Sequence, residues 1–156
     1  MDYIMKCETL KIVITPYILA RISDDFFKAA NLYNKTNFSL ATYSMYLSSI
    51  ERGLKAAILS KGCTKARKDF LAKIIGHDLE IVSEEFELSF NSIFSKKDKL
   101  EIKKVNKLYV KKGFDYFSDE MLLEMTRKYK NIPELAIIGE ISKKVNDFII
   151  ENNYFN

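Results

Sequence analysis

Residues 43–62 read Y-S-M-Y-L-S-S-I-E-R-G-L-K-A-A-I-L-S-K-G and decide the fold of the chain. Apolar residues recur in this stretch at intervals of three and four, the period of a helix with one buried face. We expect a helix from about residue 38 to residue 61, with Gly62 as a left-handed cap at its end. At 1.5 Å per residue this helix is about 36 Å long, which is the full length of a small bundle.

The same periodicity predicts further helices on both sides of this one. Thr15 and Pro16 form a helix start, because threonine can cap and proline fits the first turn. Apolar stripes then cover residues 19–33, 79–90, 102–109, 121–129 and 135–149. The sequence therefore predicts an all-α fold, a compact antiparallel bundle of five or six helices over residues 16–150. A short extended arm over residues 1–15 is expected to precede it, and residues 1–156 are expected to form a single domain.

Composition limits the class of protein. The chain has 156 residues, 47% of them hydrophobic and 29% charged, as in an ordinary globular domain. No apolar run approaches the ~18 residues that span a bilayer, and the N-terminus lacks the pattern of a secretory signal. We therefore expect a cytoplasmic protein with no membrane contact. Cys7 and Cys63 are too few to suggest a disulfide framework or a zinc site, so we expect free thiols.

Charge is distributed unevenly along the chain. Residues 96–112 contain eight lysines against Asp98 and Glu101, whereas residues 78–90 contain five acids and no base. A basic helix of this kind can follow a nucleic-acid backbone, neutralise the acidic helix beside it, or form a solvated face. The two latter interpretations are favoured, because the segment has no arginine for bidentate phosphate binding.

His77 is the one histidine of the chain and lies in the tetrapeptide G-H-D-L at residues 76–79. It either lines a cleft beside Asp78, or it caps the following helix or bonds a carbonyl in the turn. The second interpretation is favoured. Glycine-rich phosphate loops are absent, and one histidine cannot supply a histidine-rich metal site. The residues themselves thus predict no catalytic group, no metal and no cofactor.

Two motifs together resemble the HEPN domain family. They are A-x-Y-x-x-Y-L-x-x-I-E-x-x-L-K-A-x-I-L-x-K-G at residues 41–62 and G-H-D-L at residues 76–79. The stretch N-K-L-Y-V-K-K-G-F-D-Y-F at residues 106–117 is similar to the family's fourth helix, and the resemblance covers roughly residues 19–150. It implies a helical bundle that often forms dimers. Many HEPN proteins are metal-independent RNases of toxin–antitoxin, CRISPR and antiphage systems, and others bind nucleotides or accompany nucleotidyltransferases.

The sequence departs from the RNase branch of that family. The branch uses an arginine followed four to six residues later by a histidine, usually on a late helix. Here Arg67 precedes His77 with nine residues between them, and the other arginines are Arg21, Arg52 and Arg127. No catalytic residue is therefore carried over from the family.

We accordingly predict a non-catalytic, homodimeric HEPN-like module that binds a nucleotide, an RNA or a protein partner, in a toxin–antitoxin or phage-defence setting. The predicted ligand contacts are Lys55, Lys61, His77 and Asp78, around the cleft between the second and third helices. The predicted nucleic-acid contacts are Lys103, Lys107 and Lys111. Two alternatives remain: a diverged RNase toxin with a rearranged site around His77, and an adaptor for a nucleotidyltransferase or another protein.

Overall fold

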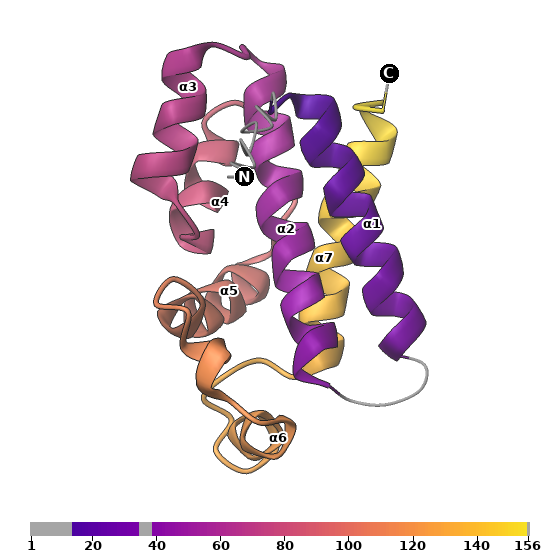
Figure 1. Ribbon diagram of the computed structural model, residues 1–156, viewed down its shortest axis with the longest axis vertical. Helices are drawn as coiled ribbons and strands as arrows, with labels where there is room; N and C mark the ends of the chain where they lie inside the picture. The colour runs from indigo at the N-terminus through magenta and orange to yellow at the C-terminus, as the bar shows by residue number, and fades with distance from the viewer. Residues whose placement is uncertain (1–13, 35–38, 156) are drawn as a thin grey trace, which may run out of the picture.

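The computed structural model describes residues 14–34 and 39–155, which form seven α-helices, a π-helix and a 3-10 helix (Figure 1). The predicted N-terminal arm falls almost entirely on residues 1–13, outside the described residues. The elements in chain order are α1 (Pro16–Asn34), α2 (Leu40–Ser60), α3 (Lys65–Asp69), the π-helix η1 (Phe70–Ile75), α4 (Leu79–Glu87), α5 (Lys96–Tyr109), the 3-10 helix η2 (Gly113–Tyr116), α6 (Asp119–Arg127) and α7 (Leu135–Glu151). No strand occurs within the described ranges.

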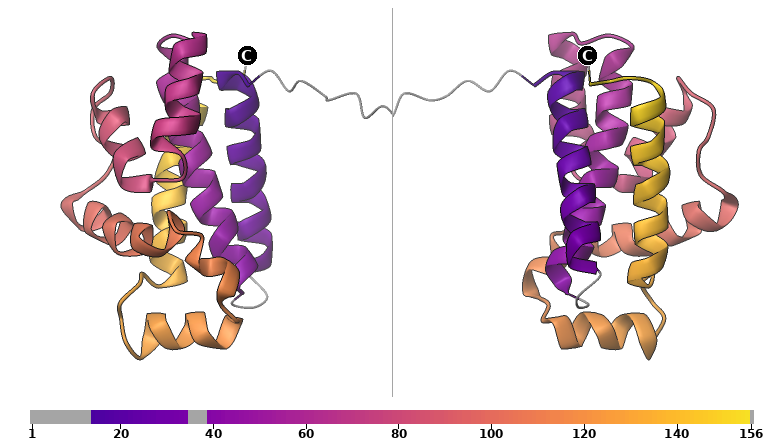
Figure 2. Two further views of the ribbon diagram at one scale, coloured as in Figure 1. Left: turned by 60° about the vertical axis from the view of Figure 1, so that its left-hand side comes forward. Right: turned by 90° about the vertical axis from the view of Figure 1, so that its right-hand side faces the viewer.

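Helices α1, α2 and α7 lie side by side and form the long axis of the molecule (Figures 1 and 2). Helices α3, α4 and α5 lie on the side of α2 away from α1, where α4 and α5 also contact α7, and α6 lies across one end of the bundle (Figure 2). Helix α2 therefore has neighbours on opposite sides, and 13 of its residues are buried.

Hydroxyl side chains define most of the helix starts. Thr15 Oγ1 accepts a hydrogen bond from Ile18 N at 3.1 Å, with Pro16 in the first turn as the sequence predicts. Ser39 caps α2, Ser95 and Asp98 form a capping box at α5, and Ser118 caps α6. These side chains satisfy backbone N–H groups that have no partner within the helix.

Gly53 sets the distance between α2 and its two long neighbours. A Cβ atom at this position would lie 2.4 Å from Val145 Cγ1, 2.7 Å from Ile149 Cδ1 and 2.9 Å from Ser23 Oγ. Beside it, the Ser23 hydroxyl donates to the Ser49 carbonyl oxygen at 2.8 Å. Only glycine allows α1, α2 and α7 to approach this closely at one level.

Helices α4 and α5 are fixed to α7 by an aromatic cluster and an ion pair, respectively. Lys144 of α7 donates to the buried carboxylate of Asp98 on α5 at 2.6 Å. The rings of Phe86, Phe90 and Phe148 have centroids 4.9–5.2 Å apart and join α4 to α7. Charge pairing and ring packing thus hold α5 and α4 against α7.

The all-α prediction is confirmed, with two differences in detail. Residues 65–75, which lie outside the apolar stripes that predict the helices, form α3 and the π-helix, so the described chain exceeds the predicted five or six helices. Gly62 is not a left-handed cap: Lys61 ends α2 in right-handed geometry, and the one described glycine with positive φ is Gly76. None of the described helices is both long and apolar enough to cross a membrane.

Candidate functional site

The tetrapeptide at residues 76–79 forms a tight turn between the π-helix and α4. Gly76 has φ of 56°, which a residue with a side chain adopts only under strain, and it ends the π-helix. Asp78 Oδ1 then accepts a hydrogen bond from Ile81 N at 2.9 Å and caps α4. His77 lies between the two and projects from the turn rather than from a helix.

Two helices hold this turn in place. On α5, Asn106 accepts a hydrogen bond from Leu79 N at 2.8 Å and donates another to Asp78 Oδ1 at 2.9 Å. On α2, Lys55 Nζ donates to the carbonyl oxygen of Gly76. The turn therefore has a fixed position relative to α2 and α5, although it is a connecting segment.

Glu51 of α2 lies at the centre of a buried polar cluster. Its Oε1 accepts from Lys55 Nζ at 2.7 Å, and its Oε2 contacts His77 Nδ1 at 3.0 Å and accepts from the Tyr109 hydroxyl at 2.7 Å. The Glu51 side chain is 4% exposed and that of Lys55 is 12% exposed. A buried carboxylate needs such partners, because desolvation without them costs several kcal/mol.

These contacts settle the ionisation of the cluster. Burial by itself raises the pKa of Glu51, but the charge of Lys55 and hydrogen bonds from Lys55, His77 and Tyr109 together hold this pKa below its usual value. Burial, and then the charge of Glu51, raise the pKa of the Tyr109 hydroxyl. At neutral pH the carboxylate is therefore ionised, and the phenol keeps its proton and donates it.

The ionised Glu51 also determines the tautomer of His77. A carboxylate only accepts hydrogen bonds, so Nδ1 carries the proton and donates, and in the neutral ring Nε2 carries the lone pair. The His77 side chain is 49% exposed, and its ring meets the Tyr109 ring edge-on with centroids 6.2 Å apart. His77 is thus a solvent-accessible, oriented imidazole with a buried carboxylate behind it.

A cavity of about 330 Å³ opens beside His77, between α2, α5 and η2. It is lined by Ser44, Ser48, Arg52, His77, Tyr109, Lys112, Phe114 and Asp115. Lys112 is held there by a left-handed backbone (φ 53°) directly after α5, and Phe114 anchors η2 by packing on Tyr43 with centroids 5.4 Å apart. Two cations, one carboxylate and an imidazole therefore share one cavity, which we call the His77 cavity.

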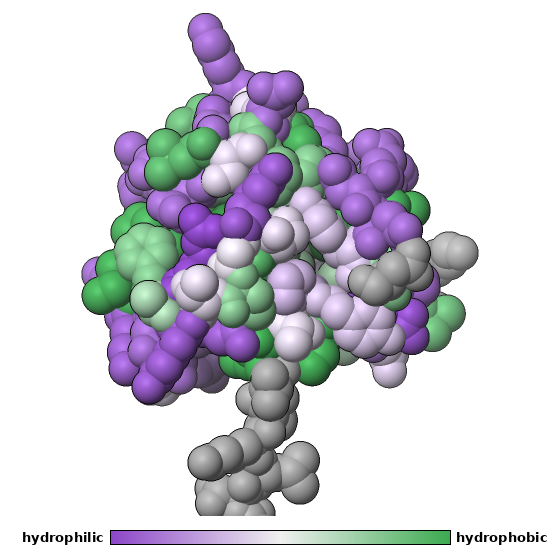
Figure 3. Space-filling model, turned by 90° about the horizontal axis from the view of Figure 1, so that it is seen from above, coloured by the Kyte–Doolittle hydropathy of each residue, from purple (hydrophilic) through white to green (hydrophobic). Residues whose placement is uncertain are grey.

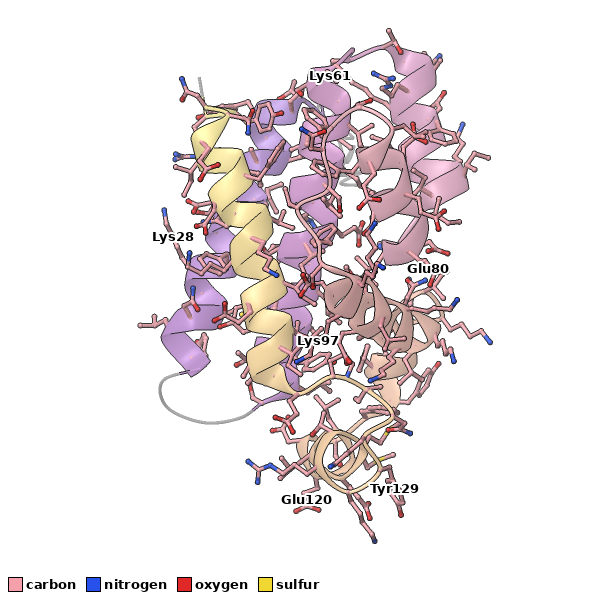
Figure 4. The ribbon with its side chains drawn as sticks, turned by 180° about the vertical axis from the view of Figure 1, so that it is seen from behind. Lys28, Lys61, Glu80, Lys97, Glu120 and Tyr129 are labelled. Carbon is pink, nitrogen blue, oxygen red and sulfur yellow. The ribbon has the colours of Figure 1, made fainter. Side chains whose placement is uncertain are left out.

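Three of the four predicted ligand contacts lie together at the turn, since Lys55 and His77 both contact Glu51 and Asp78 follows His77, whereas Lys61 lies apart. Lys55 and Asp78 hydrogen-bond within the protein and support the turn, whereas His77 lines the His77 cavity. Lys61 lies near the opposite end of the molecule from α6, with its Nζ 4.6 Å from the centroid of the Phe90 ring (Figure 4). The favoured interpretation of His77 was a helix cap or a partner of a carbonyl in the turn; instead Asp78 caps α4, and the His77 ring contacts the Glu51 carboxylate.

The three predicted nucleic-acid contacts share one surface. Lys103, Lys107 and Lys111 are exposed at and just after the outer face of α5, and no carboxylate among the described residues forms an ion pair with them. Pairing between α5 and the acidic α4 is confined to Lys99 and Glu87 at 2.7 Å. The acidic helix therefore leaves this lysine face unneutralised.

Sequence reasoning missed several residues of the site. It named Lys55 as a ligand contact, but it did not single out Glu51, Arg52, Asn106 or Tyr109. The motif I-E-x-x-L-K contained a usable signal, because it places Glu51 next to Ile50 on the apolar stripe of α2. A carboxylate at the edge of a buried stripe indicates a buried polar contact.

The site carries no cluster suited to a metal ion: across residues 14–34 and 39–155, no three His, Cys, Asp or Glu side chains lie close enough to hold one. Comparisons of the chain with family models, curated proteins and solved structures find no significant match. The family resemblance at residues 41–62 and 76–79 thus stays a prediction.

Proposed function

We propose that this protein is a HEPN-like helical module that binds a phosphate-bearing ligand, a nucleotide or an RNA, in the His77 cavity. The observation that carries the proposal is the convergence of Arg52, His77 and Lys112 on one cavity from three different elements. Guanidinium, ammonium and imidazole groups are the side chains that bind phosphate oxygens in proteins. The cavity volume of about 330 Å³ is within the range of small-ligand sites.

The lysine face of α5 supports an RNA ligand over a free nucleotide. Lys103, Lys107 and Lys111 are exposed and unpaired among the described residues, and Lys111 directly precedes Lys112 of the cavity. A strand with one phosphate in the cavity would find further cations along α5. Binding through such contacts weakens steeply as salt concentration rises, because each phosphate contact releases counterions.

Fluorescence anisotropy with a labelled single-stranded RNA tests this proposal. We expect Lys112→Gln and His77→Ala to weaken binding, and the triple change of Lys103, Lys107 and Lys111 to Glu to abolish it. Neutral substitutions of those three lysines should instead make the negative slope of log K against log salt concentration shallower by about 2. The matched control reverses Lys65, Lys73 and Lys130, which are also exposed but lie off α5. Equal losses of RNA affinity in the two triple variants would contradict the α5 surface as the RNA-binding face.

A diverged RNase is the second candidate, and the Glu51–His77 contact favours it. With Nδ1 donating to the carboxylate, Nε2 can accept the proton of a ribose 2′-hydroxyl as that oxygen attacks the adjacent phosphorus. The bond from phosphorus to the 5′-oxygen of the next nucleotide breaks, and that oxygen takes a proton from water. Arg52 and Lys112 then offer positive charge to the phosphate as negative charge builds on it. Incubation of purified protein with total RNA, beside His77→Ala, decides between binding and cleavage; equal cleavage by both proteins would exclude His77 as the base.

The resemblance also implies a setting for this activity. We propose a cytoplasmic homodimer in a toxin–antitoxin or phage-defence system, or an adaptor for a nucleotidyltransferase. Sedimentation equilibrium of the purified chain tests the dimer. Co-expression with the product of a neighbouring nucleotidyltransferase gene, followed by size-exclusion chromatography, tests the adaptor; separate elution of the two proteins would contradict it.

A further inference from the structure

A second cavity, also of about 330 Å³, lies on another side of α2, between α1, α2 and the α3–η1 segment. We call it the apolar cleft. Its walls are Ile14, Ile18, Leu19, Ile22, Glu51, Arg52, Lys55, Leu59, Lys68, Leu71 and Ala72. The apolar side chains among these line most of its surface, and the charged side chains come from α2 and α3. The cleft therefore differs in chemistry from the His77 cavity, whose lining is largely polar.

The charged residues of the cleft are not equivalent. Glu51 and Lys55 neutralise each other in the polar cluster described above. Arg52 lies over the Phe26 ring with its Cζ 5.1 Å from the centroid and donates to the Ser48 carbonyl oxygen, and Lys68 is half-buried on α3. Within the described part of the chain no carboxylate forms an ion pair with Arg52 or Lys68. Two uncompensated cations thus border an apolar cavity.

We propose that the apolar cleft binds an unbranched fatty carboxylate, with its alkyl chain among Ile18, Ile22 and Leu71 and its carboxylate at Lys68 and Arg52. A cavity of about 330 Å³ takes about ten groups the size of a methylene or a water molecule, at about 30 Å³ each. A chain of about twelve carbons fills it with the carboxylate at the edge. Figure 3, which views the end where α1 begins and α2 ends, shows hydrophobic, pale and hydrophilic residues mixed across this face.

The positive charges of Arg52 and Lys68 should select the head group of the ligand. The size of the apolar cleft should select the length of its alkyl chain. An alkylammonium of the same length would bring its charge towards Arg52 and Lys68 and be repelled. A carboxylate four carbons shorter would bury four fewer methylenes, and its affinity should fall roughly 100-fold. The apolar walls of this site come from α1, α2 and η1 rather than from α5 or η2, and Arg52 is the one side chain that it shares with the His77 cavity.

Isothermal titration calorimetry of the full chain with sodium dodecanoate, below its micellar concentration, tests the proposal. Octanoate and dodecylammonium are the comparison ligands. The main variant is Ala72→Phe, which fills the cleft from an exposed position on η1 and so leaves the core intact. Lys68→Gln is the rim variant, and Lys65→Gln, an exposed lysine of the same helix that does not line the cleft, is its matched control. Circular dichroism of each variant confirms that it is folded.

We expect dodecanoate to bind with one site per chain, and Ala72→Phe to weaken it at least tenfold. Lys68→Gln should weaken it about threefold, as for a partly exposed charge contact, with Lys65→Gln unchanged. Equal affinity for dodecanoate and dodecylammonium, or undiminished binding to Ala72→Phe, would overturn the proposal. So would sedimentation data in which Ala72→Phe converts a dimer of the wild-type chain to monomer, because a second copy would then be the occupant of the cleft.

Discussion

Helix α2 has two faces of opposite character within three residues. Gly53 faces α1 and α7, where an added Cβ would lie 2.4 Å from Val145 Cγ1, so this face is held mainly by close packing, with one buried hydrogen bond between Ser23 and Ser49. Glu51 faces α5 and the turn at residues 76–79, where it is held by three hydrogen-bonded partners. The first face contributes stability through close packing. The second places ionised groups in a buried environment at an energetic cost, which their hydrogen bonds and opposite charges offset.

The largest loss of stability is expected when a larger residue replaces Gly53 on the face of α2 that packs against α1 and α7. Gly53→Val adds three carbon atoms at a point where three helices meet, and we expect a loss of about 4 kcal/mol in the free energy of unfolding or failure to fold. Urea denaturation followed by circular dichroism measures it. Gly139→Ala is the control, because a Cβ on that α7 glycine would lie 3.3 Å from its nearest neighbour, an atom of the Tyr46 ring. A loss in Gly139→Ala as large as that in Gly53→Val would contradict contact distance as the cause, because helix propensity favours the replacement of glycine at both positions.

Removing the carboxylate of the polar face is expected to have the next largest effect. Glu51→Ala leaves the buried Lys55 ammonium without its counter-charge, and the loss should be about 3 kcal/mol. The double variant Glu51→Ala with Lys55→Met removes both charges and should recover much of this stability. The same urea titrations measure both variants. A double variant no more stable than Glu51→Ala would mean that Lys55 carries no buried charge.

The polar face should also be the acid-sensitive one. The pKa of Glu51 is lowered in the folded protein, so its ionisation stabilises the fold above the ordinary glutamate pKa. That stabilisation is lost as the pH falls below the ordinary value and through the lowered pKa. The free energy of unfolding should therefore fall more steeply between pH 5 and pH 3 in the wild-type chain than in Glu51→Gln. Parallel curves would contradict the ionised carboxylate.

The smallest loss of stability is expected when a single hydrogen bond of the Glu51 cluster is removed. Tyr109→Phe removes a single donor to Glu51 and keeps the ring beside His77, so it should cost about 1 kcal/mol. The NMR signals of the His77 ring should move as the carboxylate loses one of its donors. An unchanged stability and unchanged imidazole signals would place the Tyr109 hydroxyl in water instead of on Glu51.

The sequence predicted the helices well because their apolar stripes are local patterns. The stripe at residues 43–58 and the start at Thr15 and Pro16 each depend on neighbours within a few positions. The π-helix at residues 70–75 was not predicted, since it shares its apolar residues with an ordinary helix and differs only in its hydrogen bonds. Periodicity alone does not separate the two.

The candidate site was harder to predict, because it consists of contacts between residues distant in the chain. His77 was identified by being the one histidine, but its partners Glu51 and Tyr109 are 26 and 32 positions away in sequence. Asn106, which holds the turn, looked like one polar residue in a lysine-rich helix. Lys61 was placed with Lys55 by its position at the end of the same helix, yet it extends towards Phe90. Which face of a helix meets which neighbour is fixed only by tertiary packing.

Arg52 lines both the His77 cavity and the apolar cleft, so the two cavities share one side chain. A ligand that draws the guanidinium towards one cavity changes the charge that the other cavity presents. Thermodynamic linkage then requires reciprocity: the factor by which a fatty carboxylate changes the affinity for RNA must equal the factor by which RNA changes the affinity for the carboxylate. Through this one arginine, the concentration of either ligand would change the apparent affinity of the protein for the other.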